Sequence, residues 1–155
     1  KYPVQAVECM SRVVQKIEES TYDDVILQNK VKMFTTTDEA MGQVAKLLSQ
    51  QLKAKIILGA TMSGHTARVI SRYRPEIPTF ISCVNDRVLR QLNLSWGVLS
   101  FKLKPCTTFN EIVEKAKRYL KRNKIIKKGD QIIVIGGVPI KQPGKINVVD
   151  LQTIE

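Results

Sequence analysis

Short apolar runs alternate with segments of helical apolar spacing along most of this 155-residue chain. Such alternation is typical of an α/β fold, in which right-handed helical crossovers join parallel strands. The last run follows its predecessor too closely for a helical crossover, so its strand should be antiparallel. The sequence therefore predicts a three-layer α/β/α sandwich around a mostly parallel five-stranded sheet with an antiparallel last strand. The expected strands are residues 56–58, 79–84, 98–103, 131–135 and 146–151.

Two capping-box patterns mark the starts of helices. Thr36-x-x-Glu39 and Thr108-x-x-Glu111 each place a hydroxyl residue three positions before a glutamate. The apolar spacing that follows predicts one buried face on each helix. These faces are Ala40, Val44, Leu47, Leu48 and Leu52 on the first helix, and Ile112, Val113, Ala116, Tyr119 and Leu120 on the second.

The first 35 residues differ in pattern from the rest of the chain. Apolar steps of three and four predict an amphipathic helix over residues 3–19, with Pro3 at its start. Residues 21–32 show no period and are expected to form a connection and a domain boundary. The predicted organisation is a helix over 1–20, a connection over 21–35 and a domain over 36–155. Because Lys1 rather than Met begins the sequence, we expect a piece of a longer protein.

A loop rich in hydroxyl residues follows the first apolar run. Thr61, Ser63 and Thr66 surround Gly64, and a helical pattern begins directly afterwards. The first turn of a helix presents unpaired N–H groups and a positive dipole end, and glycine lets a ligand approach the backbone. These features predict a phosphate-binding loop. The residues by themselves fit equally well a simpler role, in which the hydroxyls cap the helix and the glycine makes the turn.

A second loop, residues 136–144, follows the fourth predicted strand. In parallel sheets ligands bind beyond the carboxyl ends of the strands, so both loops should face one crevice. Micromolar affinity for a phosphate needs about 8 kcal/mol, more than one loop supplies, so Lys141 or Lys145 is expected to add a second anchor. The candidate binding residues are Thr61, Ser63, Gly64, His65, Thr66, Lys141, Gly144 and Lys145.

Several catalytic motifs are missing from the sequence. His65 is the one histidine, which excludes paired-histidine metal sites. Neither a GxxxxGK[ST] loop nor a GxGxxG turn after a strand is present. We therefore predict no catalytic residue and no metal ligand in this chain.

The cysteines and the hydropathy suggest a cellular compartment. Cys9, Cys83 and Cys106 are odd in number and far apart, which favours reduced thiols and a cytoplasmic location. No apolar run approaches the ~20 residues that a membrane span needs, so no membrane association is expected.

The net charge of +11 suits anionic partners. Glu111–Lys115 and Glu114–Arg118 have the i,i+4 spacing of helical ion pairs, which favours an ordinary solvated helix face. A nucleic-acid groove is the less favoured alternative, because the interleaved aromatic residues of single-strand binders are missing. The basic residues concerned are Lys115, Lys117, Arg118, Lys121, Arg122, Lys124, Lys127 and Lys128.

Several short segments stand out when the chain is taken in order. They are Lys1-Tyr2-Pro3-Val4-Gln5-Ala6-Val7 with Met10, Thr61-Met62-Ser63-Gly64-His65-Thr66-Ala67, Ser71-Arg72-Tyr73-Arg74-Pro75-Glu76-Ile77-Pro78, Asn93-Leu94-Ser95-Trp96-Gly97-Val98, Lys127-Lys128-Gly129-Asp130, Gly136-Gly137-Val138-Pro139 and Gly144-x-x-Asn147. Each motif is short, but their order and spacing together are specific. Together they resemble the C-terminal domain of pyruvate kinase, and bacterial and archaeal members in particular, and the likeness runs from end to end.

The resemblance implies a regulatory and assembly domain without chemistry of its own. Residues 1–20 would be the last helix of the catalytic barrel. The full enzyme would transfer phosphate from phosphoenolpyruvate to ADP in glycolysis, using Mg²⁺ and K⁺ bound upstream of this chain. The domain would contribute to the interfaces of a tetramer and bind a phosphorylated effector. Thr61, Ser63, Gly64 and Thr66 would hold the phosphate, with a backbone N–H from His65, and residues 136–144 would close over it.

Two departures from the family pattern bear on the effector. Relatives that bind fructose 1,6-bisphosphate often have lysine at the position of Met62, and an arginine for the second phosphate has no match near residues 106–112. The resemblance therefore favours a monophosphate, such as AMP or a sugar phosphate, over the bisphosphate. A loop that no longer binds an effector is the other outcome.

Two further expectations concern partners. The same fold could serve a stand-alone phosphate-binding protein instead of an enzyme domain. The last strand, residues 146–151, is expected at a sheet edge, where it would pair across a subunit two-fold.

Overall fold

The computed structural model describes residues 1–20, 36–140 and 145–155. The predicted connection 21–35 and two candidate site residues, Lys141 and Gly144, lie outside this part. The chain divides into two compact units, Lys1–Met33 and Phe34–Glu155. In the first unit, α1 spans Pro3–Glu18, with a proline in its first turn as expected.

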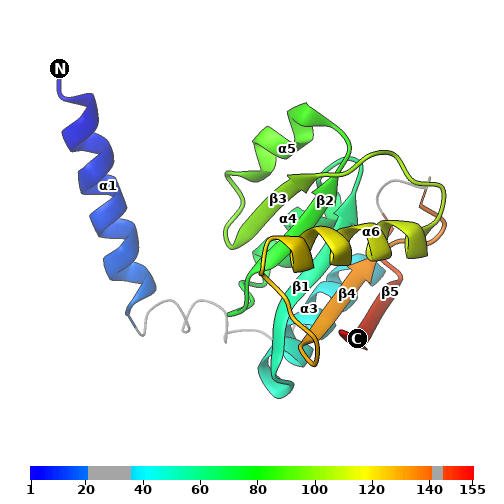
Figure 1. The fold of residues 1–155 in the computed structure, drawn as a ribbon. Coiled ribbons are helices and arrows are strands. Elements are labelled where there is room, and N and C mark those ends of the chain that lie inside the picture. The colour runs from blue at the N-terminus through cyan, green and yellow to red at the C-terminus, as the bar shows by residue number, and fades with distance from the viewer. Residues whose placement is uncertain (21–35, 141–144) are drawn as a thin grey trace. The chain divides into compact units, whose positions relative to one another are not determined.

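The second unit alternates helices and strands in the predicted order (Figure 1). The first strand is longer than its apolar run, because Gly59, Ala60 and Thr61 continue the parallel pairing with β2. The elements are α3 (Thr37–Gln51), β1 (Ala54–Thr61), α4 (His65–Arg72), β2 (Thr79–Cys83), α5 (Asp86–Leu92), β3 (Val98–Lys102), α6 (Phe109–Arg122), β4 (Gln131–Gly136) and β5 (Val148–Thr153).

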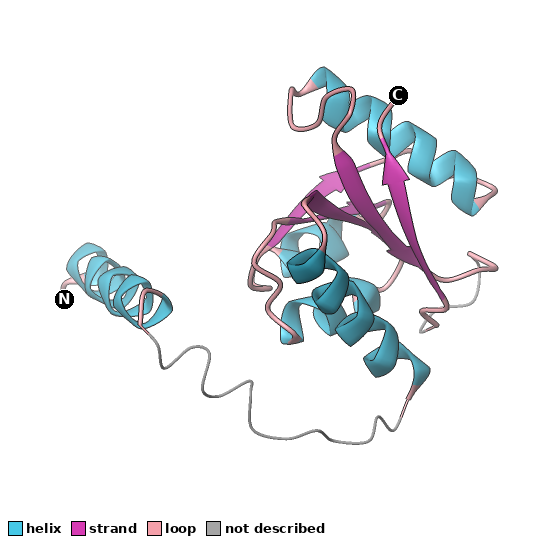
Figure 2. Cartoon of the chain, turned by 90° about the horizontal axis from the view of Figure 1, so that it is seen from below, coloured by secondary structure: helices cyan, strands magenta, loops and turns pink. Residues whose placement is uncertain are grey.

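The five strands form one sheet in the order β3-β2-β1-β4-β5. β1 pairs in parallel with β2 and β4, and β2 in parallel with β3. β5 is antiparallel to β4, which confirms the predicted last strand, although it begins two residues later than expected. Figure 2 shows the sheet between helices on both sides. The predicted α/β sandwich is therefore confirmed.

Alternate residues of the central strands supply two separate cores. Ile57 and Ile133 face α3, α4 and α5, whereas Ile56 and Ile132 face α6. Side chains on a strand point to opposite faces in turn, so a strand covered on both faces is apolar throughout. The uninterrupted apolar runs in the sequence follow from this double burial.

The predicted buried face of α3 is wrong in part. Val44 and Leu47 are 41% and 54% exposed. The residues that α3 buries are instead the small ones, Gly42, Ala45 and Ser49. A Cβ at Gly42 would lie 2.8 Å from the Tyr73 ring, so close packing against α4 selects the small-residue face. The apolar spacing alone did not reveal this packing.

In both predicted capping boxes, the hydrogen bond from the glutamate N–H to the threonine hydroxyl is confirmed. The Thr36 hydroxyl accepts from the Glu39 N–H at 3.3 Å, and the Thr108 hydroxyl from the Glu111 N–H at 3.2 Å. These bonds fix the residues at which α3 and α6 begin. They thereby place both helix starts relative to the sheet.

Candidate functional site

The carboxyl ends of the parallel strands open into a cavity of about 180 Å³. The loop after β1, the end of β2, the segment between β3 and α6 and the loop after β4 all contribute to its walls. β1 lies between β2 and β4 in the sheet, because the chain runs from β1 to β2 and β3 on one side and then crosses to β4 on the other. Ligands of open α/β sheets bind at such switch points.

The first wall is the turn from β1 into α4. Gly64, the residue before α4, has φ 83°, and its N–H donates to the Thr61 hydroxyl at 2.9 Å. The first turn of α4 leaves backbone N–H groups without intrahelical partners. The Thr61 hydroxyl thus closes the turn before α4, whereas no side chain caps the helix itself, so the helix end remains available to an anion.

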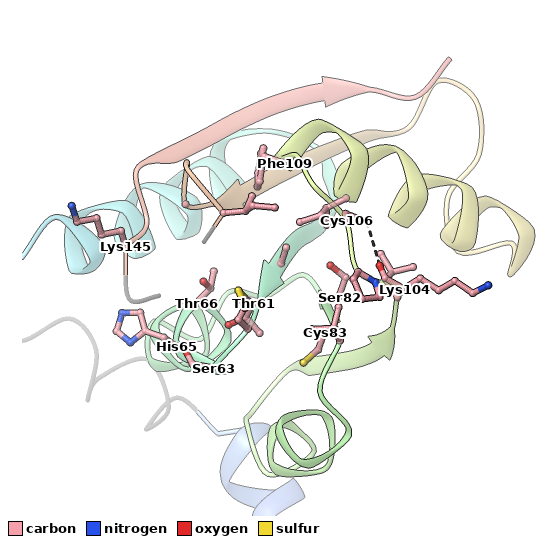
Figure 3. Close-up of a pocket in the computed structure, with 18 residues that line it drawn as sticks. Thr61, Ser63, His65, Thr66, Ser82, Cys83, Lys104, Cys106, Phe109 and Lys145 are labelled. Atoms are coloured by element: carbon pink, nitrogen blue, oxygen red, sulfur yellow. Dashed lines mark hydrogen bonds between the residues drawn. The ribbon is translucent and has the colours of Figure 1, made fainter. Parts of the chain in front are cut away.

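Thr66 brings a hydroxyl to the same wall. It is 6% exposed and lines the cavity, and within the described residues no hydrogen bond engages its side chain. Figure 3 shows Thr61 and Thr66 side by side below the cavity and Phe109 above it. The Thr66 hydroxyl oxygen is not one of the fully buried atoms that lack a partner, so it is accessible from the cavity and can bind water or a ligand.

His65 lines the cavity, but its ring is engaged elsewhere. Its Nε2 lies 2.7 Å from Oδ2 of Asp38 on α3. The second oxygen of this carboxylate, Oδ1, accepts from the Ile146 N–H at 2.7 Å. His65 can therefore offer a ligand its backbone N–H, as expected, while its side chain is held by α3.

The opposite wall is mostly apolar. The ring of Phe109 covers Gly136, where an added Cβ would meet the ring at 2.4 Å. The ring thus lies against the end of β4, at Gly136. The other apolar residues of this wall are Val84, Leu103, Pro105, Ile112 and Ile140.

The loop after β4 is closed at its base by Asn147. The Asn147 side chain accepts from the Val138 N–H at 2.8 Å and donates to the Val138 carbonyl at 2.7 Å. Gly137 packs on the Lys145 backbone so closely that an added Cβ would lie 2.0 Å from the Lys145 carbonyl oxygen. The two ends of the predicted second loop are therefore fixed to each other.

Lys145 reaches the cavity rim without pointing inward. It is exposed and lines the cavity, together with Lys104 from the opposite side. In Figure 3 the ammonium groups of both lysines point away from the other labelled residues. Neither lysine is placed as an anchor for a ligand inside the cavity.

The Glu111 carboxylate, near the apolar wall of the cavity, is ionised and paired with a lysine. Glu111, in the first turn of α6, accepts from Lys115 Nζ at 2.7 Å and from the Thr107 N–H at 2.8 Å. The bond from Lys115, followed by the bonds from Thr107, lowers the pKa of Glu111 to about 2. The expected Glu111–Lys115 pair is confirmed. Glu114 instead pairs with Lys117, and Arg118 donates to its backbone carbonyl.

The described residues offer no metal centre. They contain no group of three or more His, Cys, Asp or Glu side chains that could hold a metal ion. All three cysteines are free thiols, and Cys83 is buried. No helix in the described part is long and apolar enough to cross a membrane.

The residues predicted for the first loop lie together at the cavity, but most of the other lining residues were not predicted from the sequence. Thr61, Ser63, His65, Thr66 and Lys145 all line the cavity. The missed second wall could have been found, because the capping box at Thr108 marks a helix start after a parallel strand. Asp38 carries no sequence signal for its contacts, since its partners lie 27 and 108 residues away. Asn147 stood in the Gly144-x-x-Asn147 segment, but its bonds to Val138, nine residues away, were not predicted.

Comparison with known proteins agrees with the geometry. The family described as "Pyruvate kinase, alpha/beta domain" matches residues 39–152. Pyruvate kinases of Lactobacillus delbrueckii subsp. bulgaricus and Sporosarcina psychrophila are 33% and 30% identical over 99% of this chain. The chain spans about a quarter of their length, 26% in both cases.

Solved structures show the same fold. A crystal structure of a pyruvate kinase from Cryptosporidium parvum matches with a TM-score of 0.71 and 25% identity. The match covers 81% of this chain and 24% of that one. Sequence and fold agree on one assignment: the chain belongs to the pyruvate kinase family, and residues 39–152 match its alpha/beta domain.

Proposed function

We propose that this chain is the C-terminal regulatory domain of a pyruvate kinase and binds a phosphorylated small molecule at the Thr61–Thr66 loop. The observation that carries the proposal is the hydroxyl of Thr66, a residue 6% exposed overall, which lines the cavity at the open end of α4 and has no hydrogen-bond partner in the described residues. Helix dipole, free N–H groups and hydroxyl together suit a phosphate. The domain performs no chemistry itself.

The ligand is a monophosphate, of a sugar or a nucleoside such as AMP, rather than fructose 1,6-bisphosphate. Met62 supplies no charge to the loop, Phe109 and Ile112 make the facing wall apolar, and the ammonium group of Lys104 on that side points away from the other labelled residues (Figure 3). Burying an unpaired phosphate against apolar side chains would be costly. An uncharged organic group fits that wall.

The expected affinity for phosphate alone is millimolar. A helix end contributes about 0.3–1 kcal/mol and up to ~2 in favourable geometry. A hydrogen bond to a charged group adds roughly 1.5–3 kcal/mol. Millimolar binding needs about 4 kcal/mol, which one loop can supply.

Ligand-dependent melting tests the site. Inorganic phosphate, ribose 5-phosphate, AMP and fructose 1,6-bisphosphate are titrated while Tm is followed, and the monophosphates should raise it.

Thr66→Val removes one hydroxyl and should weaken phosphate binding roughly tenfold or more. Thr66→Glu should abolish it by placing a carboxylate in the loop. Thr153→Glu, exposed on β5 and paired with the far end of β4, is the control. Unchanged Tm with every ligand contradicts the proposal.

The rest of the proposal concerns the whole enzyme. The full protein would transfer phosphate from phosphoenolpyruvate to ADP with Mg²⁺ and K⁺, with α1 as the last helix of its barrel. This domain would contribute to the interfaces of a tetramer. Sequencing the coding region upstream of Lys1 separates this from a stand-alone binding protein: a barrel there supports the proposal, and a stop codon contradicts it.

A further inference from the structure

One carboxylate joins the two loops of the candidate site. Asp38 lies in the first turn of α3, outside the cavity lining, with its side chain 16% exposed. Its Oδ2 lies 2.7 Å from His65 Nε2, and its Oδ1 accepts from the Ile146 N–H at 2.7 Å. These partners are 27 and 108 residues away in the sequence.

The two partners lie at different parts of the cavity: His65 lines it, and Ile146 directly follows the lining residue Lys145. His65 is the first residue of α4, so its backbone N–H is one of the groups that would face a phosphate. Ile146 is 1% exposed and follows Lys145, where the second loop returns to the sheet. Asn147 fixes the ends of this loop to each other, whereas Asp38 fixes the returning end to the phosphate loop.

The charge of Asp38 argues against a role through attraction. A carboxylate close to an anion site repels the ligand, and a partly buried pair is only weakly screened by salt. Any favourable effect of Asp38 on phosphate binding must therefore arise from where it holds His65 and Ile146. Electrostatics and positioning predict opposite signs for its removal.

We infer that Asp38 is a positioning residue that sets the spacing between the phosphate loop and the second loop. Binding of phosphate at Thr61–Thr66 therefore changes the environment of the Ile146 amide. The inference rests on the proposed function. It assigns to the site a residue that touches no ligand. Its effect passes through two hydrogen bonds and the rigid start of α3.

Phosphate affinity of matched variants gives the first test. Asp38→Ala should weaken binding of inorganic phosphate at least fivefold, although it removes a negative charge. His65→Ala should weaken it similarly, whereas His65→Gln, which keeps a side-chain N–H donor for Asp38, should restore most of the affinity. Glu39→Gln is the control, because Glu39 forms the neighbouring α3–α4 ion pair with Arg72 and lies outside the lining. It should leave the affinity within twofold.

The amide spectrum of the 155-residue chain gives the second test. Inorganic phosphate should shift the amide signals of residues 61–67 and of Ile146 with one dissociation constant. Asp38→Ala should reduce the shift of Ile146 at saturation at least fivefold while the loop signals still move. If Asp38→Ala does not fold, the His65→Ala and His65→Gln pair makes the same comparison.

The outcomes separate the two claims. No shift at residues 61–67 in the unsubstituted chain overturns the proposed phosphate site, and the inference with it. Shifts at the loop without a shift at Ile146 overturn the inference alone. So does an Asp38→Ala variant that binds phosphate as tightly as the parent chain or more tightly.

Discussion

Gly64 combines a left-handed backbone conformation with close neighbours at the start of α4. Its φ is 83°, and an added Cβ would lie 2.7 Å from Arg68 Nη1 and 3.3 Å from Val88 Cγ1. Gly129 has a similar φ of 87°, and nothing lies within 4 Å of the Cβ position there. Alanine substitutions at the two positions therefore share the same backbone strain and differ in crowding, which occurs at Gly64 alone of the two.

Gly64→Ala should lower the free energy of unfolding by more than Gly129→Ala does. The left-handed conformation costs a non-glycine residue about 1–2 kcal/mol at both positions. At Gly64 the methyl group also displaces Arg68, whose Nη2 donates to the Ser63 carbonyl at 3.0 Å. Urea unfolding of both variants measures the difference. Equal losses would show that crowding at Gly64 has no energetic effect.

Glu111 should make stability depend on pH below about 4.5. Its folded pKa of about 2 lies below the ordinary value of 4.5, so the unfolded chain binds the proton more readily. The stabilising contribution is complete above the unfolded value and is lost as pH falls towards the folded one. Because the carboxylate is near the surface, salt should reduce the effect.

Glu111→Gln should flatten the loss of stability between pH 5 and pH 2, measured as the urea midpoint at several pH values. Lys115→Gln removes the largest cause of the shift and should raise the pKa of Glu111 in a carboxyl NMR titration. A Glu111→Gln variant that follows the parent's pH curve would contradict this assignment.

At the scale of elements, the contact between α3 and α4 is set by small residues. A Cβ at Gly42 would lie 2.8 Å from Tyr73 Cε2 and 2.9 Å from Val69 Cγ1. Two ion pairs, Asp38–His65 and Glu39–Arg72, join the same helices. The two helices therefore meet closely beside the phosphate loop.

Gly42→Ala should destabilise the protein although alanine is the better helix former. Overpacking costs typically 1–3 kcal/mol, whereas the gain in helix propensity is about 1 kcal/mol. Gln43→Ala, on the exposed side of α3, is the control and should be neutral or slightly stabilising. Thermal unfolding compares the two. A stabilised Gly42→Ala variant would mean that Tyr73 moves aside freely.

Local patterns predicted the elements well where one physical rule dominates. Uninterrupted apolar runs located β1 and β4 because both faces of these strands are buried, and hydroxyl caps located α3 and α6. The buried face of α3 depended on the shape of α4, which no local pattern contains. The loop at Thr61–Thr66 could be predicted because its residues are close together in the sequence. The contacts of Asp38 could not, because its partner Ile146 is 108 residues away.

At the scale of the whole molecule, two strands form the edges of the sheet, β3 and β5. Along β5, Asp150, Leu151 and Thr153 are exposed, with Leu151 40% exposed. An exposed edge strand is a template for pairing with another chain. The expected pairing across a subunit two-fold stays a prediction and concerns β5.

The chain should form dimers through β5, and Leu151→Lys should shift it to monomers, because lysine on an edge strand opposes pairing. Leu94→Lys, at a position 92% exposed in the turn after α5, should leave the assembly unchanged. Sedimentation measures both. A parent chain that stays monomeric at high concentration would contradict the prediction.

The basic charge is spread over helix surfaces rather than gathered in the site. Lys115 and Lys117 pair with Glu111 and Glu114 on α6, and Lys121 donates to the Glu155 carbonyl. These contacts support the solvated helix face expected for the basic residues. They also leave the nucleic-acid alternative without an observation in its favour.

Asn147 has a consequence for how such domains diverge. Its paired hydrogen bonds with Val138 close the segment between β4 and β5 into a ring. Ile146 within the ring packs in the core and must be kept, whereas exposed residues such as Pro139 and Lys145 can be exchanged while both strands keep their register. Ligand preference can then drift between lineages, or be transplanted by an engineer, without a new fold having to evolve.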